Sequence, residues 1–101
     1  MIAVKDLTPL KQISIFTRNS EYQFHVIEPS ERRGLLSGGP FGDEQHEAIL
    51  IGGLMGNESH GRLCTNLEIG ACALFYISAK QRMKRLTTSM IINLRVSCEV
   101  V

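Results

Sequence analysis

The chain has 101 residues, of which 44% are hydrophobic and 21% are charged, and its formal net charge is +1. This composition is typical of a soluble globular protein, and no apolar run approaches the roughly 20 residues that span a membrane, so we expect no membrane partner. The first residues lack the basic and apolar regions of a secretion signal, which predicts a cytoplasmic protein. The length predicts one domain, with a lead-in segment over residues 1–12 and a single small barrel domain over 13–101.

Two alternating runs joined by a short polar turn form the first clear element, a predicted β-hairpin. The second run places Tyr22, Phe24 and Val26 on one face, which we expect to point into the core. Asn19 and Ser20 supply the turn, because asparagine tolerates a left-handed backbone and both side chains can bond to nearby backbone groups. Replacing both with alanine is predicted to lower the stability by roughly 1 to 2 kcal/mol.

The rest of the chain continues as short strands separated by glycine-rich turns. Turns are predicted at residues 28–34 and 38–45, and Gly52 with Gly53 predicts a β-bulge at a barrel corner. A helical turn is expected, if anywhere, over residues 80–86. Further strands are predicted at 35–37, 46–51, 71–78, 85–89 and 90–96.

This pattern predicts an all-β fold: a small SH3-like or Sm-like barrel of about five to seven short antiparallel strands with little helix. A closed barrel is favoured over two full sheets because closure removes exposed strand edges in so short a chain.

Charge is distributed unevenly along the chain. Residues 1–68 hold six basic and nine acidic residues, whereas residues 69–101 hold five basic residues and one acidic residue. This asymmetry can mark an anion-binding face, or it can bring oppositely charged faces of two subunits together. The basic residues of the second part that form the candidate anion or nucleic-acid contacts are Lys80, Arg82, Lys84 and Arg85.

No arrangement of residues predicts a catalytic, metal or cofactor site. Three cysteines with wide spacing do not form a disulfide framework and fit a reducing compartment. His60 and Cys64 are four residues apart, but no second pair completes a tetrahedral metal site. The glycine-rich segment 34–42 lacks the lysine of a phosphate-binding loop, and Ser37 lacks the spacing of a hydrolase nucleophile. We therefore expect a protein that is not an enzyme.

Several short motifs between residues 13 and 92 resemble those of one group of proteins. They are Thr17-x-Asn19-Ser20-x-Tyr22, Gly38-Gly39, Ala48 before an apolar strand ending at Gly52, Ile69-Gly70, and Thr88-Ser89 before an apolar pair. The pattern is similar to that of small uncharacterised bacterial proteins with an SH3-like or Sm-like barrel. The resemblance implies such a barrel in a bacterial cytosolic protein, and it implies no catalytic residues.

Three functions stay open at this point. The first is a non-catalytic module that acts by self-association, as a homo-oligomer, or by binding a protein partner, since strand edges and unlike charged faces can pair. The second is binding of RNA or single-stranded DNA by the basic segment 80–85, with Tyr22, Phe24 or Tyr76 stacking on bases. We expect the adaptable loops at 38–43 and 80–85 to be where any ligand binds.

The third function is that of a PilZ-like cyclic-dinucleotide receptor, whose barrel is of similar size. That family has an arginine-rich lead followed by an Asp/Asn-x-Ser-x-x-Gly segment. Here Arg32 and Arg33 lie between predicted strands, and Asn19-Ser20 lacks both the spacer and the later glycine.

Overall fold

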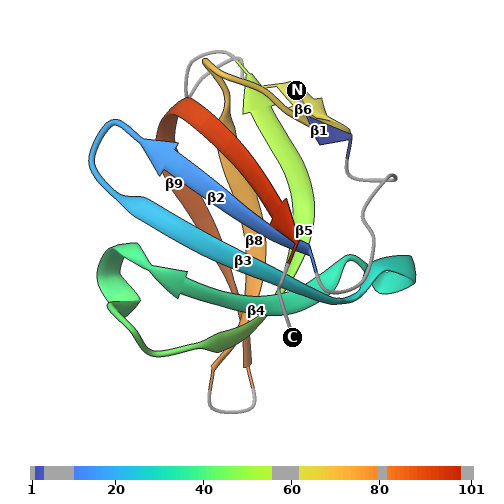
Figure 1. Ribbon diagram of the computed structural model, residues 1–101. Coiled ribbons are helices and arrows are strands. Elements are labelled where there is room, and N and C mark those ends of the chain that lie inside the picture. The colour runs from blue at the N-terminus through green and yellow to red at the C-terminus, as the bar shows by residue number, and fades with distance from the viewer. Residues whose placement is uncertain (1, 4–10, 56–61, 80–81, 99–101) are drawn as a thin grey trace.

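The computed structural model describes residues 2–3, 11–55, 62–79 and 82–98, and it shows a closed β-barrel (Figure 1). Six antiparallel strands form the ring in the order β4-β3-β2-β9-β8-β5, and pairing of β4 with β5 closes it. The predicted small antiparallel barrel is therefore confirmed. The strands of the ring are β2 (Lys11–Thr17), β3 (Glu21–Glu28), β4 (Arg33–Gly38), β5 (His46–Met55), β8 (Cys72–Ala79) and β9 (Arg82–Cys98).

Three shorter strands lie beside the ring. Strand β6 (Arg62–Cys64) extends the sheet beyond β5, and β1 (Ile2–Ala3) pairs with β7 (Asn66–Leu67). Helical structure among the described residues consists of the short 3₁₀ turns η2 (Pro29–Glu31) and η3 (Gly39–Phe41), both within predicted turns. None of the described helices has the length and hydropathy needed to cross a membrane.

Strand β9 is longer than the sequence pattern predicts. It is one strand of 17 residues, which pairs first with β8 and then with β2 as it curves around the barrel (Figure 1). The expectation of a helical turn over residues 80–86 is therefore wrong for the described residues from Arg82 onward, and the strands predicted at 85–89 and 90–96 are parts of one strand. The physical reason is that pairing with β8 continues to the end of the hairpin, where Arg82 lies opposite Ala79.

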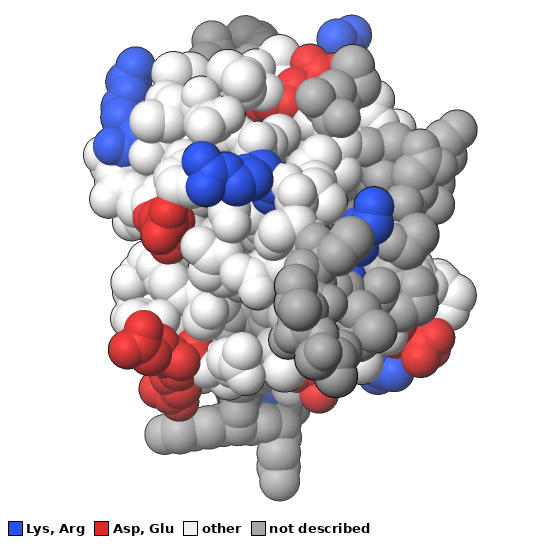
Figure 2. Space-filling model, viewed as in Figure 1, with Lys and Arg blue, Asp and Glu red and all other residues white. Residues whose placement is uncertain are grey.

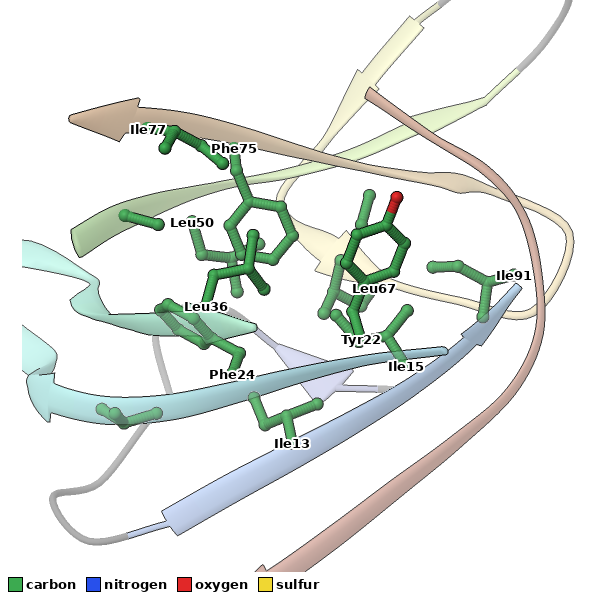
Figure 3. Packing of buried hydrophobic residues seen from close by; sticks show 13 residues of the cluster. Ile13, Ile15, Tyr22, Phe24, Leu36, Leu50, Leu67, Phe75, Ile77 and Ile91 are labelled. Carbon is green, nitrogen blue, oxygen red and sulfur yellow. The ribbon is translucent and has the colours of Figure 1, made fainter. Parts of the chain in front are cut away.

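The core fills the interior of the barrel with side chains from every strand of the ring (Figure 3). Tyr22, Phe24 and Val26 are all buried, which confirms the predicted inward face of β3. The rings of Phe24 and Phe75 pack with their centroids 5.3 Å apart at an interplanar angle of 59°. The remaining buried members of the cluster are Ile13, Ile15, Leu36, Ala48, Leu50, Leu67, Ala73, Ile77 and Ile91.

The predicted bulge at Gly52 is confirmed, and it explains how β5 pairs with three other strands. The register of β5 against β8 shifts between Leu50 and Gly52. One part of β5 pairs with β4 and the part after the bulge pairs with β6. A Cβ atom at Gly52 would lie 2.2 Å from the carbonyl oxygen of Cys64, so only glycine lets β6 approach this closely.

Candidate functional site

The predicted basic segment divides between the two faces of the β8–β9 hairpin. Lys80 lies outside the described residues. Lys84 is paired with Ile77, whose side chain is buried, whereas Arg85 is paired with Tyr76, whose side chain is exposed. Because neighbouring residues of a strand point to opposite faces, Arg82 and Lys84 share the inward side of the hairpin and Arg85 lies on the outer side. These cations do not form one continuous basic surface.

Basic residues on one face of the barrel are also dispersed. Figure 2 shows one face of the barrel, on which the described lysines and arginines lie as separate spots between neutral side chains. Arg95 lies with its guanidinium carbon 5.7 Å from the centroid of the Phe16 ring, in a cation–π contact. An extended basic stripe of the kind that follows a nucleic-acid backbone is therefore not seen on that face.

Two of the three aromatic residues considered for base stacking belong to the core. Tyr22 is 5% exposed and Phe24 is fully buried, so neither ring can be reached from solvent. Burial raises the pKa of the Tyr22 hydroxyl above its usual value, and the hydrogen bond with Ser20 opposes part of that shift. Tyr76, in contrast, is 41% exposed on the outer surface of β8.

A row of side chains crosses four strands on the outer surface of the barrel. Arg33 of β4 lies opposite Ile49 of β5, which lies opposite Tyr76 of β8, and Tyr76 lies opposite Arg85 of β9. Cross-strand partners share a face of the sheet, so the row carries two apolar side chains between two arginines. The neighbouring positions Leu35 of β4 and Glu47 of β5 are paired on the same face.

The Arg33 end of this row is hollowed and carries acidic groups. A pocket of about 360 Å³ is lined by Ile27, Arg33, Gly34, Leu35 and Glu47. The Nη2 atom of Arg33 lies 2.6 Å from Oε2 of Glu31, and its Nη1 atom lies 3.4 Å from Oε1 of Glu47. Two carboxylates thus surround one guanidinium, and this end of the row has a net negative charge.

Two further exposed apolar residues complete the same surface. Ile27 is 50% exposed, Met83 is 52% exposed, and Met83 lies opposite Ser78 beyond the Tyr76–Arg85 pair. We call the whole surface the outer patch. Its members are Ile27, Glu31, Arg33, Leu35, Glu47, Ile49, Tyr76, Met83 and Arg85.

A second hollow lies at the end of the barrel, where η3 meets the β8–β9 hairpin. This end pocket has a volume of about 280 Å³ and contains residues from both loops that the sequence singled out for ligand binding. The rings of Phe41 and His46 lie with their centroids 4.4 Å apart. Glu44 is adjacent, with Oε1 3.6 Å from Nε2 of His46. The lining residues are Pro40, Phe41, His46, Ile77, Lys84, Arg85 and Leu86.

Sequence reasoning did not identify Phe41 and His46 as site residues. Phe41 is the single aromatic residue in the glycine- and proline-rich turn 38–45, and this isolated position could have indicated a binding residue. His46 begins β5 and is distant in sequence from Lys84 of β9, and the two residues line one pocket because β8 pairs with β5 on one side and with β9 on the other.

The β2–β3 turn contains Asn19 and Ser20 as predicted, but Thr17 holds it closed. The hydroxyl of Thr17 donates to the carbonyl of Ser20 at 2.8 Å and accepts from its N–H at 3.0 Å. Asn19 contributes its backbone N–H, which donates to Oγ of Ser89 at 3.2 Å. Asn19 does not have the left-handed backbone expected of it, since Arg32 is the non-glycine residue with positive φ among those described.

Candidate metal ligands do not gather in the described part of the chain. Within it, no three His, Cys, Asp or Glu side chains are placed to hold one metal ion. His60 lies outside the described residues. Cys64 and Cys72 are free and half-buried.

Comparison of the chain with protein-family models, with curated proteins and with solved structures gives no match. Its own geometry is therefore the basis for assigning a function.

Proposed function

We propose that this barrel is a non-catalytic module that self-associates through the outer patch, forming a homodimer with two-fold symmetry. The observation that supports this most directly is the row Arg33, Ile49, Tyr76 and Arg85. One end of the row, where Glu31 and Glu47 surround Arg33, has a net negative charge. The other end carries Arg85, and the middle is apolar.

Such a surface is complementary to a second copy of itself. In a two-fold contact each subunit presents the same patch, and the two patches run in opposite directions. A residue at one end of the patch therefore contacts a residue at the other end of the partner's patch, and this contact occurs twice. Arg85 of each subunit then faces Glu47 and Glu31 of its partner, while Ile49 and Tyr76 meet near the axis. Two sets of opposite charges form, which favours this orientation over others.

The apolar part of the patch supplies the driving force for association. Ile27, Tyr76 and Met83 each leave about half of their surface in water. Removing apolar surface from water is worth about 25 cal/mol per Å², and tyrosine and methionine are enriched in interfaces. Burial of these three side chains together with Ile49 would form the dry centre that a specific interface needs.

Pairing through strand edges is less well supported than pairing through this face. Strand β4 is paired on both edges, by β3 and by β5, and β9 is paired with β8 over residues 82–90 and with β2 over residues 91–98. Among the described strands, β6 is the end strand of the seven-stranded sheet. That strand has three residues, so its edge offers few backbone groups to another chain. Faces of the barrel are the larger surface available for contact.

Charge reversal tests the dimer. Glu47→Arg and Arg85→Glu should each raise the dimer dissociation constant by at least about tenfold, because each places like charges opposite one another. The double variant, or an equimolar mixture of the two single variants, should recover part of the lost affinity, because position 47 of one subunit and position 85 of the other again carry opposite charges. Sedimentation velocity over a concentration series measures this, with thermal melting to confirm that each variant folds.

Arg18→Glu is the matched control for Arg85→Glu, since Arg18 is exposed on the β2–β3 turn and away from the outer patch. It makes the same change of net charge and should leave the dissociation constant unaltered. A wild-type protein that stays monomeric at high concentration, or a double variant that fails to recover, would disprove the proposal.

The cyclic-dinucleotide alternative gains no support from the described residues. A receptor arginine needs to be available to phosphate, whereas Arg33 is already paired with Glu31 and Glu47. Arg32 closes η2 in a left-handed backbone conformation.

A further inference from the structure

The end pocket differs from the outer patch in both shape and charge. It is a hollow with apolar and aromatic walls, and cations from one strand line its side. We propose that the end pocket binds single-stranded nucleic acid, with one base held against Phe41 and a neighbouring phosphate held by Lys84.

The walls suit a flat, largely apolar group. Pro40, Phe41, Ile77 and Leu86 surround a volume of about 280 Å³, and the Phe41 ring is half-buried rather than sealed in the core. Every nucleobase has a π-face, and stacking on an aromatic side chain is worth about 1 to 3 kcal/mol per base regardless of the sequence. A base inside a duplex has both faces covered and cannot enter such a hollow, so the pocket selects single strands.

The cations of the pocket are available to a ligand. Within the described residues, the ion pairs formed by arginine are those of Arg33, and neither Lys84 nor Arg85 is paired with a carboxylate. Both side chains are exposed on β9. A phosphate beside Lys84 would gain a charge-assisted hydrogen bond without breaking any that exists among the described residues.

The acidic groups on the opposite side set the direction of the strand. Glu44 lies beside His46, and Asp43 precedes it in the same loop. These carboxylates repel phosphate on the η3 side, so the backbone is expected to follow β9 while the base points toward Phe41. The Glu44 carboxylate can then accept hydrogen bonds from N–H groups of the base, which include the ring N–H of uracil and thymine.

Fluorescence anisotropy tests the proposal with three labelled probes of about ten nucleotides: oligouridine, oligodeoxythymidine and a mixed-sequence DNA duplex. At low salt both single strands should bind at least about tenfold more tightly than the duplex, and affinity should fall as salt rises.

Two variants separate stacking from charge. Phe41→Leu keeps an apolar side chain but removes the ring, and it should lower affinity by about tenfold without changing the salt dependence. Lys84→Gln should lower affinity and also reduce the slope of log affinity against log salt, because one phosphate contact is lost. Arg18→Gln removes an exposed cation elsewhere and should change little.

Several outcomes would overturn the proposal: no binding at low salt, equal affinity for duplex and single strands, unaltered affinity in Phe41→Leu, or an equal loss in Arg18→Gln. Competition by polyglutamate as strong as that by oligouridine would also overturn it, because it would indicate an acidic peptide partner. Phe41 packs against the core, so thermal melting accompanies each variant. If Phe41→Leu fails to fold, the duplex comparison and the Lys84→Gln salt slope decide the matter.

Discussion

The β2–β3 and β8–β9 hairpins have similar sequence patterns but different surroundings. In the first, Tyr22 and Phe24 are buried, and the turn is tied to β9 by the bond from Arg18 N–H to the carbonyl of Met90 at 2.9 Å. In the second, the outer half of the hairpin is exposed from Arg82 to Arg85 and projects from the barrel (Figure 1). Alternation of apolar and polar residues therefore occurs in both hairpins. Only the packing around each hairpin shows that the first is part of the core and that the end of the second is exposed to a partner.

The largest expected difference between the hairpins is in the loss of stability when one side chain of each is truncated to alanine. Phe24→Ala removes a fully buried ring that packs on Phe75, and it should lower the free energy of unfolding by about 3 to 5 kcal/mol. Met83→Ala truncates a side chain that is 52% exposed and should change it by less than about 0.5 kcal/mol. Urea denaturation of both variants measures this, and similar losses would show that the β8–β9 hairpin is part of the stability core.

Two glycines near the β2–β3 hairpin offer a finer comparison. Gly39 and Gly42 both have positive φ, but a Cβ at Gly39 would lie 2.5 Å from the Tyr22 ring, whereas a Cβ at Gly42 meets nothing within 4 Å. Gly42→Ala should lower the free energy of unfolding by about 1 to 2 kcal/mol, because of its backbone conformation. Gly39→Ala should lower it by about 1 to 3 kcal/mol more, because its Cβ also meets the Tyr22 ring. Equal melting temperatures for the two variants would mean that η3 moves away from Tyr22 without cost.

The side chain that closes the β2–β3 turn makes a smaller contribution to stability. The sequence suggested Asn19 and Ser20 for this role, whereas in the structure the hydroxyl of Thr17 makes the bonds that close the turn. Thr17→Val should cost about 1 to 2 kcal/mol, because it removes both hydroxyl bonds to Ser20 at a buried position. Asn19→Ala should cost less than about 0.5 kcal/mol, since its bond to Ser89 comes from the backbone. Chemical denaturation of both variants measures this, and a larger loss for Asn19→Ala would restore the original assignment.

The smallest expected effect is a dependence on high pH. Because the pKa of Tyr22 is raised above 10.0 in the folded protein, the unfolded chain loses this proton first as the pH rises. The contribution to stability is present below pH 10 and is lost as the pH rises through the folded-state pKa. Tyr22→Phe should remove this loss. Denaturation at neutral pH and above pH 10 compares the two proteins, and identical pH profiles would contradict the assignment.

The local features of the fold were predictable from residues that are close in sequence. The inward face of β3 follows from the alternation of Tyr22, Phe24 and Val26, and the bulge follows from Gly52. The single strand β9 was missed because its polar residues 82–85 resemble a turn, although pairing with β8 stabilises them as strand.

The candidate sites were predictable only in part. The loops at 38–43 and 80–85 were identified as the places for a ligand, and the structure brings Phe41 and Lys84 of those loops to one pocket. Lys84 and Arg85 were treated as one group, yet they lie on opposite sides of the hairpin. The outer patch was not foreseen, because Arg33, Ile49, Tyr76 and Arg85 come from four strands spread over half of the chain.

The sequence by itself determined which segments become strands and which side of each strand is apolar, because successive side chains of a strand point in opposite directions whatever its neighbours are. Only the tertiary structure decided which strands are adjacent, and therefore which exposed side chains meet. Pairing of β4 with β5, of β5 with β8 and of β8 with β9 places Arg33 in line with Arg85, and it brings His46 and Lys84 into one pocket. Register between distant strands depends on packing of the whole barrel interior, and no local pattern encodes it.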